Sequence, residues 1–274
     1  MYHLVLTSII IITLNEEENI ESTIISAKKA AQTKSGKLLP IEIIISDGGS
    51  TDDTIEIAKK RADKVIHAPK GRYKQLNAGA KGSTGDILLF LHADTILPKG
   101  AIVKILHTYK NPCVLGGGFK KVWNWSPNVK RTKFINILMY FWEGFGNWTV
   151  RFLKSFPGDN AIFVNRKIFE ELGGFAPMWI CEDFDFSLRL KKLCRKKTCN
   201  PQNNKQKKSR IVCINSPVKT STRRFEKYGF LKVLRLWFFI YWLWRLGMPS
   251  DRLKARFNKY AVEPEKVHKS FIRF

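Results

Sequence analysis

Three short, largely apolar segments in the first hundred residues constrain the fold of this chain more than any other feature. They are Leu4 to Ile12, Ile41 to Ser46 and Ile87 to Leu91. A strand that is buried on both faces has such a sequence, whereas a strand with one solvent face alternates apolar and polar residues. Between them, Glu16 to Gln32 and Thr51 to Ala62 have helical spacing. Strands that alternate with helices in this way predict right-handed βαβ units and a mostly parallel sheet.

Acidic side chains follow two of these segments at the point where each strand would end. Asp47 and Gly48 follow the second segment, and His92 and Asp94 follow the third. Ligands of open α/β sheets bind at the carboxyl ends of the strands. The glycine lets the backbone approach a ligand closely, and Asp47 can accept hydrogen bonds from a base N–H or a ribose hydroxyl. Two acidic strand ends can therefore hold a nucleotide together with a divalent cation.

Two further segments carry candidate site residues. Arg72 and Asn77 lie on one short segment, and an arginine can bind a diphosphate through two parallel hydrogen bonds. Glu182 and Asp183 begin a predicted helix, where a carboxylate can act as a general base on an acceptor hydroxyl. The same acidic pair can instead stabilise the helix dipole, and Arg72 can be an ordinary surface residue. The residues alone leave these alternatives open.

The charge of the chain is strongly basic and uneven. There are 48 Lys and Arg against 23 Asp and Glu, a formal net charge of +25. From residue 195 onward, 21 Lys and Arg face only four Asp and Glu. Such a surface attracts nucleic acid, anionic lipid headgroups or phosphate-bearing substrates, although it can also be merely a solvated lysine-rich surface. Because no nucleic-acid reading module is recognisable, we expect no specific nucleic-acid partner.

An aromatic segment lies near the end of the chain. Leu236 to Trp244 are nine consecutive apolar or aromatic residues, with cations on both sides. A helix that spans a bilayer needs about 20 apolar residues, so this segment is too short to cross one. Its Trp and Tyr side chains and flanking cations suit a helix that lies in the headgroup region. A terminal helix packed on the domain, or a dimer contact, is the alternative for Leu231 to Leu246.

The middle of the chain is less regular. Phe134 to Phe145 is rich in aromatic residues, which suits either a helix or a loop that lines a cleft. Lys196 to Arg210 is polar and basic without a period, so we expect an exposed insertion or a partly disordered loop there.

The cysteines and the first residues of the chain indicate the cellular compartment. The five cysteines are Cys113, Cys181, Cys194, Cys199 and Cys213. Their number is odd and no C-x-x-C pair occurs, so neither a disulfide framework nor a zinc site is favoured. Leu4 to Leu14 is apolar but has no basic region before it and no small-residue cleavage site after it. We therefore expect reduced thiols in a cytoplasmic protein, with a possible peripheral position on the inner face of the cell membrane.

An ordered set of motifs resembles the family 2 glycosyltransferases, which have the GT-A fold. The matching segments are SIIIITLNEEENI (8–20), ISDGGSTDDT (45–54), GRYKQLNAGA (71–80), GDILLFLHADTILP (85–98), GDNAIFV (158–164), ELGGF (171–175), EDFDFSLRL (182–190) and TSTRRFEKYG (220–229). Within the family, the chain resembles a small bacterial group often labelled "transferase 2, rSAM/selenodomain-associated". The resemblance implies a GT-A (Rossmann-like) domain over 1–228, with a nucleotide-sugar half (1–110) and an acceptor half (111–228). A basic, amphipathic helical extension would occupy 229–274.

The resemblance also implies roles for individual residues. The donor-binding set would be Thr13, Asn15, Glu16, Asp47, Gly48, Arg72, Asn77, His92, Asp94, Arg223 and Arg224. Asp94 would bind Mg²⁺ or Mn²⁺, Asp183 would be the catalytic base, and Glu182 would support it. His92 stands where the family usually has the first Asp of its metal motif, which leaves the choice of metal open. The carboxyl groups of Asp47, Asp94 and Asp183 should then converge on one pocket.

These features together predict an inverting, metal-assisted glycosyltransferase, a hexosyltransferase in particular. It would move a sugar from a nucleotide-diphosphate sugar to the hydroxyl of an acceptor, with a lipid or lipid-linked acceptor on an anionic membrane as one possibility. A sugar-1-phosphate nucleotidyltransferase is an alternative, but residues 13–17 are acidic where a triphosphate would lie. A non-enzymatic basic protein that binds nucleic acid or membranes is the other.

Overall fold

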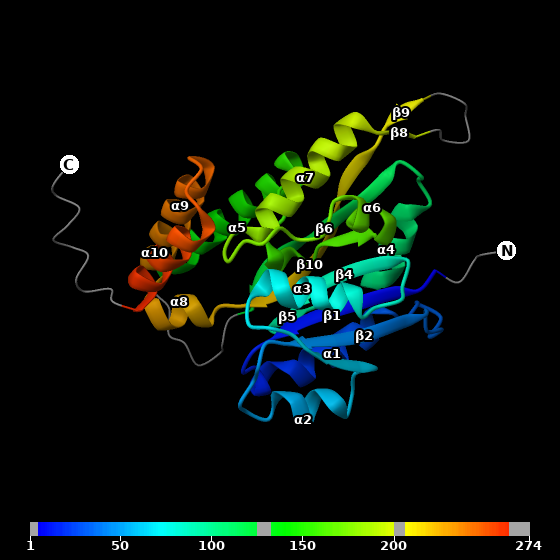
Figure 1. The fold of residues 1–274 in the computed structure, drawn as a ribbon, viewed down its shortest axis with the longest axis horizontal. Coiled ribbons are helices and arrows are strands. Elements are labelled where there is room, and N and C mark those ends of the chain that lie inside the picture. The colour runs from blue at the N-terminus through cyan, green and yellow to red at the C-terminus, as the bar shows by residue number, and fades with distance from the viewer. Residues whose placement is uncertain (1–4, 125–132, 200–205, 263–274) are drawn as a thin grey trace.

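The computed structural model describes residues 5–124, 133–199 and 206–262 of the chain (Figure 1). Eight strands of this described part form one sheet in the order β3-β2-β1-β4-β7-β6-β10-β5. Their bounds are β1 Thr7–Thr13, β2 Ile41–Asp47, β3 Lys64–His67, β4 Ile87–His92, β5 Thr95–Ile96, β6 Val114–Asn124, β7 Phe163–Asn165 and β10 Arg210–Ser221. A separate small hairpin joins β8 (Thr198–Cys199) to β9 (Lys207–Lys208).

The sheet is mostly parallel, as predicted. Strands β1, β2, β3 and β4 run parallel to one another, and β6 runs parallel to β10. The short strand β7 is antiparallel to both β4 and β6, and β5 is antiparallel to β10. Strand β7 thereby joins the two parallel groups of strands into one surface.

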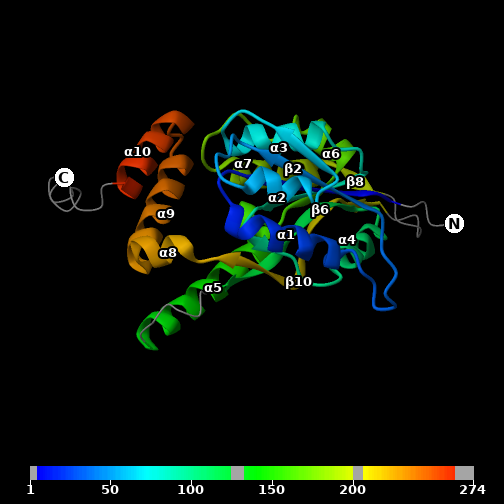
Figure 2. The same cartoon turned by 90° about the horizontal axis from the view of Figure 1, so that it is seen from below.

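Helices cover both faces of this sheet (Figure 2). Helices α1 (Glu17–Ala30), α2 (Thr54–Lys59) and α4 (Ala101–Tyr109) lie on one face. Helices α3 (Arg72–Lys81), α6 (Arg166–Glu171) and α7 (Glu182–Lys196) lie on the other. Ile9 and Ile11 belong to the core under the first group, whereas Ile10 and Ile12 belong to the core under the second. Because alternate side chains of β1 serve both cores, the strand must be apolar at every position.

The remaining helices form a second region beside the sheet. These are α5 (Lys133–Leu153), α8 (Arg223–Tyr228), α9 (Phe230–Arg245) and α10 (Ser250–Val262). Helices α5, α8 and α9 share a core around Trp123, and α9 and α10 share another around Ile240 and Leu253. The segment that was expected as a helix or a cleft-lining loop is thus a helix, and it extends to Leu153. Among the described helices, none has both the length and the apolar character needed to cross a bilayer.

Three local predictions need correction. Helix α2 spans only Thr54–Lys59, after a turn in which the Thr51 N–H donates to the Asn15 side chain and the Thr54 N–H donates to Asp52. Part of the expected loop 196–210 is the β8–β9 hairpin. Cys113 and Cys199 form a disulfide, although reduced thiols were expected. The fold brings their Cα atoms to 5.2 Å across 86 residues of chain, a proximity that cysteine spacing does not reveal.

Candidate functional site

The turn after β2 is organised by Asp47. This residue is fully buried, and its carboxylate accepts hydrogen bonds from the backbone N–H groups of Gly49 (2.8 Å) and Ser50 (2.9 Å) and from the Ser50 hydroxyl. The Ser50 hydroxyl in turn accepts a hydrogen bond from the Asn15 backbone N–H at 2.9 Å. Asp47 therefore shapes the edge between β1 and β2, and direct binding of a base by its carboxylate stays a prediction.

The end of β1 is held against the same turn. The Thr13 carbonyl accepts hydrogen bonds from the Gly48 backbone N–H at 2.9 Å and from the Gln75 side chain at 2.7 Å. The buried Thr13 hydroxyl has no hydrogen-bond partner within the described ranges. The next residues, Asn15 and Glu16, bind the loop before α2 through Thr51 and Thr54. Thr13, Asn15, Glu16, Asp47 and Gly48 thus lie together at one sheet edge, as predicted.

A glycine turn brings the other candidates together. The Gly158 backbone N–H donates to Asp183 Oδ2 at 2.5 Å. A Cβ atom at Gly158 would lie 2.6 Å from His92 Nε2 and 3.4 Å from Asp183 Oδ2, so a side chain at this position would displace the His92 imidazole. His92, Gly158, Glu182 and Asp183 line one small cavity. The ends of β4 and the start of α7 therefore meet at the Gly158 turn.

Asp159 is a site residue to which our sequence analysis assigned no role. Its Oδ1 lies 3.7 Å from His92 Nδ1, and its Oδ2 lies 3.1 Å from Lys121 Nζ. Burial alone would raise the pKa of Asp159, but Lys121 and His92 outweigh it and hold the pKa well below its usual range. Burial lowers the pKa of His92, so the imidazole is mainly neutral at neutral pH. The only sequence signal for Asp159 was the segment GDNAIFV, because its contacts come from distant parts of the chain.

An ion pair links α3 to α7 beside this turn. Arg72 Nε lies 2.8 Å from Glu182 Oε1, and a second guanidinium nitrogen lies 3.3 Å from Oε2. The Glu182 side chain is only 1% exposed, and burial raises its pKa to about 7 despite the opposing effect of Arg72. Glu182 therefore fixes Arg72 and the first turn of α7. Asp183, the next residue, points to the Gly158 turn.

The C-terminal arginines reach the same sheet edge. Arg223 at the start of α8 pairs with Glu16, and one of its nitrogens lies 3.7 Å from Asp94 Oδ2. Burial, together with the nearby Arg72, lowers the pKa of Arg224, whereas Asp159 and Asp94 oppose this change. Helix α8 thus brings two cations to the acidic end of β4.

The Asn77 side chain contacts the turn before α7. Its side chain donates to the Phe175 carbonyl at 2.8 Å and accepts from the Phe175 N–H at 2.9 Å. Both ends of the amide are used to hold α3 against the turn before α7. That Asn77 binds the donor stays a prediction.

Asp94 offers carboxylate oxygen, the ligand type that Mg²⁺ and Mn²⁺ accept. Burial raises the pKa of Asp94, and the negative charge of Asp159 acts in the same direction. A bound cation would stabilise the ionised form of Asp94, which these two effects disfavour. No group of three or more His, Cys, Asp or Glu among the described residues can hold a metal ion by itself. Phosphate oxygens and water would have to complete the coordination, as is usual for Mg²⁺.

An open, mostly parallel sheet with acidic strand ends that face a glycine turn defines an α/β domain of the GT-A type. The chain belongs to glycosyl transferase family 2, whose sequence profile matches residues 8–173. This confirms the family and the fold inferred from the sequence, while membership of the narrower bacterial group stays a prediction.

Curated relatives cover only part of this chain. It is 30% identical over 166 residues to "Probable glycosyltransferase YdaM" of Bacillus subtilis (strain 168), which is 55% of this chain and 39% of the relative. It is 29% identical over 83 residues to "Uncharacterized glycosyltransferase alr2836" of Nostoc sp. (strain PCC 7120 / SAG 25.82 / UTEX 2576), 28% of this chain and 26% of that protein. The aligned part therefore spans less than half the length of these relatives.

Solved structures share the fold at low sequence identity. The mannosyltransferase PcManGT from Pyrobaculum calidifontis, in complex with GDP-Man and Mn²⁺, has a TM-score of 0.55 and 18% identity, over 92% of this chain and 69% of its own. The glucosyl-3-phosphoglycerate synthase from Mycobacterium tuberculosis, in complex with Mn²⁺, UDP and glucosyl-3-phosphoglycerate, has a TM-score of 0.53 and 21% identity, over 89% and 81%. At such identities the likeness shows the fold alone.

Proposed function

We propose that the protein is an inverting glycosyltransferase that moves a sugar, a hexose in particular, from a nucleotide-diphosphate sugar to an acceptor hydroxyl. The observation that carries this proposal is the meeting of His92, Asp159 and Asp183 around Gly158, next to the acidic end of β4. Family membership favours this reaction over nucleotidyl transfer and over a purely binding protein.

The donor would bind across the ends of β1, β2 and β4. The Thr13 hydroxyl and the Gly48 backbone would contact a nucleoside there, beside the hydrogen-bonded turn around Asp47. Arg72 and Arg224 supply positive charge near Asp159 and Asp94, where a diphosphate needs it. Structural neighbours were solved with GDP-Man and with UDP, which supports a nucleotide-sugar donor without specifying the base.

Asp94 would hold the divalent cation, Mg²⁺ or Mn²⁺, with His92 as a further candidate ligand if the ion is Mn²⁺. When bound, the ion would neutralise negative charge on the departing diphosphate. Arg223, which faces Asp94 from α8, is placed to add a second positive charge on the same side. The two neighbours named above were solved with Mn²⁺, which supports a divalent ion in this protein.

Asp183 would act as the general base. It would take the proton of the acceptor hydroxyl as the oxygen attacks the anomeric carbon, while the bond from that carbon to the diphosphate breaks on the opposite face. The hydroxyl must lie between the carboxylate and the sugar, as water does in inverting glycosidases. Gly158 binds Asp183 Oδ2 and so orients the carboxylate, while Glu182 holds the helix start through Arg72.

The acceptor is proposed to be a lipid or lipid-linked hydroxyl at an anionic membrane. The predicted interfacial segment 231–246 is helix α9, which packs Val233 and Ile240 inward and exposes Phe238 and Trp242. The inner face of α9 is therefore packed on the protein, and membrane contact by its exposed face stays a proposal.

Replacing Asp183 by Asn tests the base directly. We expect kcat to fall by about 10²–10⁴-fold, the usual contribution of a general base, while calorimetry with GDP and UDP in the presence of Mn²⁺ gives unchanged affinity. Turnover can be followed as nucleoside diphosphate released from GDP-mannose, UDP-glucose or UDP-GlcNAc in the presence of a lipid extract.

The matched control is Asp185→Asn, which removes a carboxylate from the same helical turn that pairs with Arg189. This variant should retain most of the turnover. Near-normal turnover in Asp183→Asn, or an equal loss in both variants, would show that Asp183 is not the base.

A further inference from the structure

Helix α5 presents a continuous stripe of large apolar side chains to solvent. The stripe consists of Ile137, Phe141, Phe145, Trp148 and Phe152, which are between 50% and 69% exposed. Their spacings of four, four, three and four residues place them on one face of an α-helix. Soluble surfaces scatter single exposed apolar residues, whereas a row of five along one helix marks an interaction surface.

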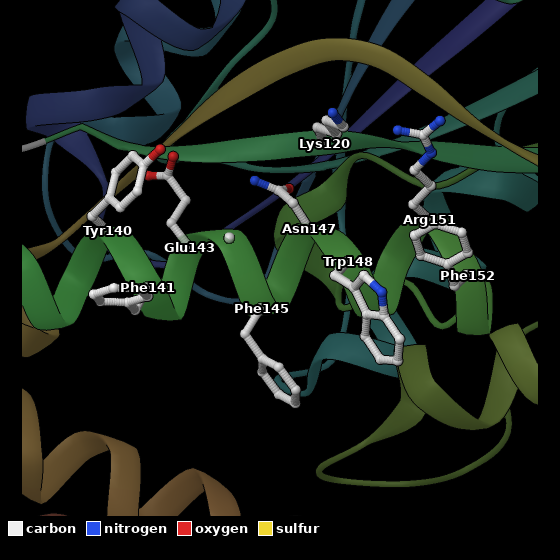
Figure 3. A pocket seen from close by; sticks show the side chains of 10 residues that line it. Lys120, Tyr140, Phe141, Glu143, Phe145, Asn147, Trp148, Arg151 and Phe152 are labelled. Atoms are coloured by element: carbon white, nitrogen blue, oxygen red, sulfur yellow. The ribbon is translucent and has the colours of Figure 1, made fainter.

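The opposite face of α5 is fixed to the sheet, so the stripe cannot turn inward. The Asn147 side chain accepts from the Lys121 N–H at 2.9 Å and donates to the Lys121 carbonyl at 2.8 Å. Glu143 accepts a hydrogen bond from the Trp123 N–H at 3.2 Å. Met139 and Val150 are buried on this inner face. Figure 3 shows Asn147 and Glu143 on the side of the strand and Phe145 and Trp148 on the other side.

Cations lie beside the aromatic rings. Lys120 and Arg151 line a groove of about 620 Å³ together with Tyr140, Phe145, Trp148 and Phe152 (Figure 3). The Arg151 guanidinium lies 5.5 Å from the centre of the Phe152 ring. Aromatic rings with neighbouring Lys and Arg are the side chains that anchor proteins in the headgroup region of a bilayer.

We propose that this α5 stripe docks the protein onto an anionic phospholipid bilayer, with the helix lying in the plane of the headgroups. The 21 residues of α5 would extend about 30 Å along the surface. Charge complementarity decides between a bilayer and a second copy of this chain, since two copies with a net charge of +25 repel each other. Anionic headgroups would instead pair with Lys120 and Arg151.

Docking through α5 would place the site close to the bilayer. Lys120 faces the groove, and the next residue of β6, Lys121, binds Asp159 in the site. Neighbouring residues of a strand point to opposite faces, so the groove and the site lie on either side of one strand. This inference deepens the proposed membrane attachment, and it does not depend on sugar transfer.

Sedimentation of the full chain with phosphatidylcholine vesicles, with or without phosphatidylglycerol, tests the docking. The wild type should bind only the anionic vesicles, and added salt should weaken binding. The double variant Phe145→Ser/Trp148→Ser should bind them about tenfold more weakly or worse, because two half-exposed aromatic rings lose their burial in lipid. Lys120→Gln/Arg151→Gln should weaken binding to anionic vesicles specifically.

Three control variants test whether the α5 stripe, rather than another part of the molecule, is responsible for vesicle binding. Leu38→Ser, at an exposed leucine remote in sequence, should leave binding unchanged. Phe238→Ser/Trp242→Ser on α9 should weaken binding less than the α5 variant does. Asp183→Asn should bind vesicles like the wild type, so a failure of the proposed reaction and a failure of docking give different results.

Circular dichroism should show that the variants keep the helical content of the wild type. Full vesicle binding by the folded α5 variant would overturn the proposal. The proposal would also be overturned if the wild type does not bind vesicles but forms a dimer, measured by light scattering, that the α5 variant does not form.

Discussion

Large apolar side chains are buried in the sheet half of the molecule, whereas many of those on the helices beside it are exposed to solvent. Phe90 in β4 is 3% exposed and packs edge-to-face on Phe175, whereas Phe141 in α5 is 69% exposed. The strands around Phe90 are covered by helices on both faces, but α5 has a sheet on one side only. Burial stabilises the first region. Apolar residues in the second region contribute less to stability and leave a surface that can bind a partner.

A matched pair of phenylalanines gives the largest expected difference. Phe90→Ala should lower the free energy of unfolding by about 3–5 kcal/mol, because it removes buried surface and leaves a cavity. Phe141→Ala should change it by about 0.5 kcal/mol or less, because the ring is already in water. Urea unfolding monitored by circular dichroism measures both values. A similar loss of unfolding free energy in both variants would show that Phe141 on α5 is buried to the same extent as Phe90 on β4.

The ion pair between Arg72 and Glu182 tests how the two halves are joined. Arg72→Met leaves the Glu182 carboxyl buried without its cation, and we expect a loss of about 2–3 kcal/mol at pH 7. The folded-state pKa of Glu182, already raised to about 7, should rise further. A raised carboxyl pKa gives stability that is present below the unfolded value and lost as pH rises, so the variant should be less impaired at pH 5.

The double variant Arg72→Met/Glu182→Gln is the control for this pair. It should recover part of the stability at pH 7 and lose the extra pH dependence, because no buried charge remains. A single Arg72→Met variant whose stability loss is the same at pH 5 and pH 7 would contradict the role of the buried carboxylate.

The same contrast between the regions explains what could be predicted from the sequence. The bounds of β1, β2 and β4 differ from the expected segments by only a few residues, because burial on both faces leaves a strong local pattern. Asp47, Asp94 and Asp183 were recognisable as candidates because each lies at or within two residues of a strand end or in the first turn of a helix.

The parts that were missed depend on distant contacts. Asp159 reaches His92 only because β7 inserts antiparallel between β4 and β6, and no local spacing encodes that insertion. Asn77 has the same amide whether it faces a ligand or Phe175, so its sequence position could not distinguish the two. The exposed stripe of α5 has the same periodicity as a buried one, and only the packing of the other face shows which side meets solvent.

A smaller effect than at the Arg72–Glu182 pair is expected at Asp159, where the site meets the helical region. Its partner Lys121 also lies 4.4 Å from the centre of the Trp123 ring, which stacks on Trp237 of α9. Asp159→Asn should cost only about 1 kcal/mol at neutral pH, since the pair is partly exposed. The depressed pKa of Asp159 means that its contribution is present above the unfolded value of about 3.9 and is lost as pH falls further. The variant should therefore lose less stability than the wild type between about pH 4 and the acid transition, measured by urea unfolding at a series of pH values.

Lys121→Met should also reduce the loss of stability below about pH 4, because it removes the main cation that depresses the pKa of Asp159. If the free energy of unfolding falls equally with pH below about pH 4 in the wild type and both variants, Lys121 and Asp159 are not coupled. The sheet and the helical region would then be joined through apolar packing around Trp123 alone.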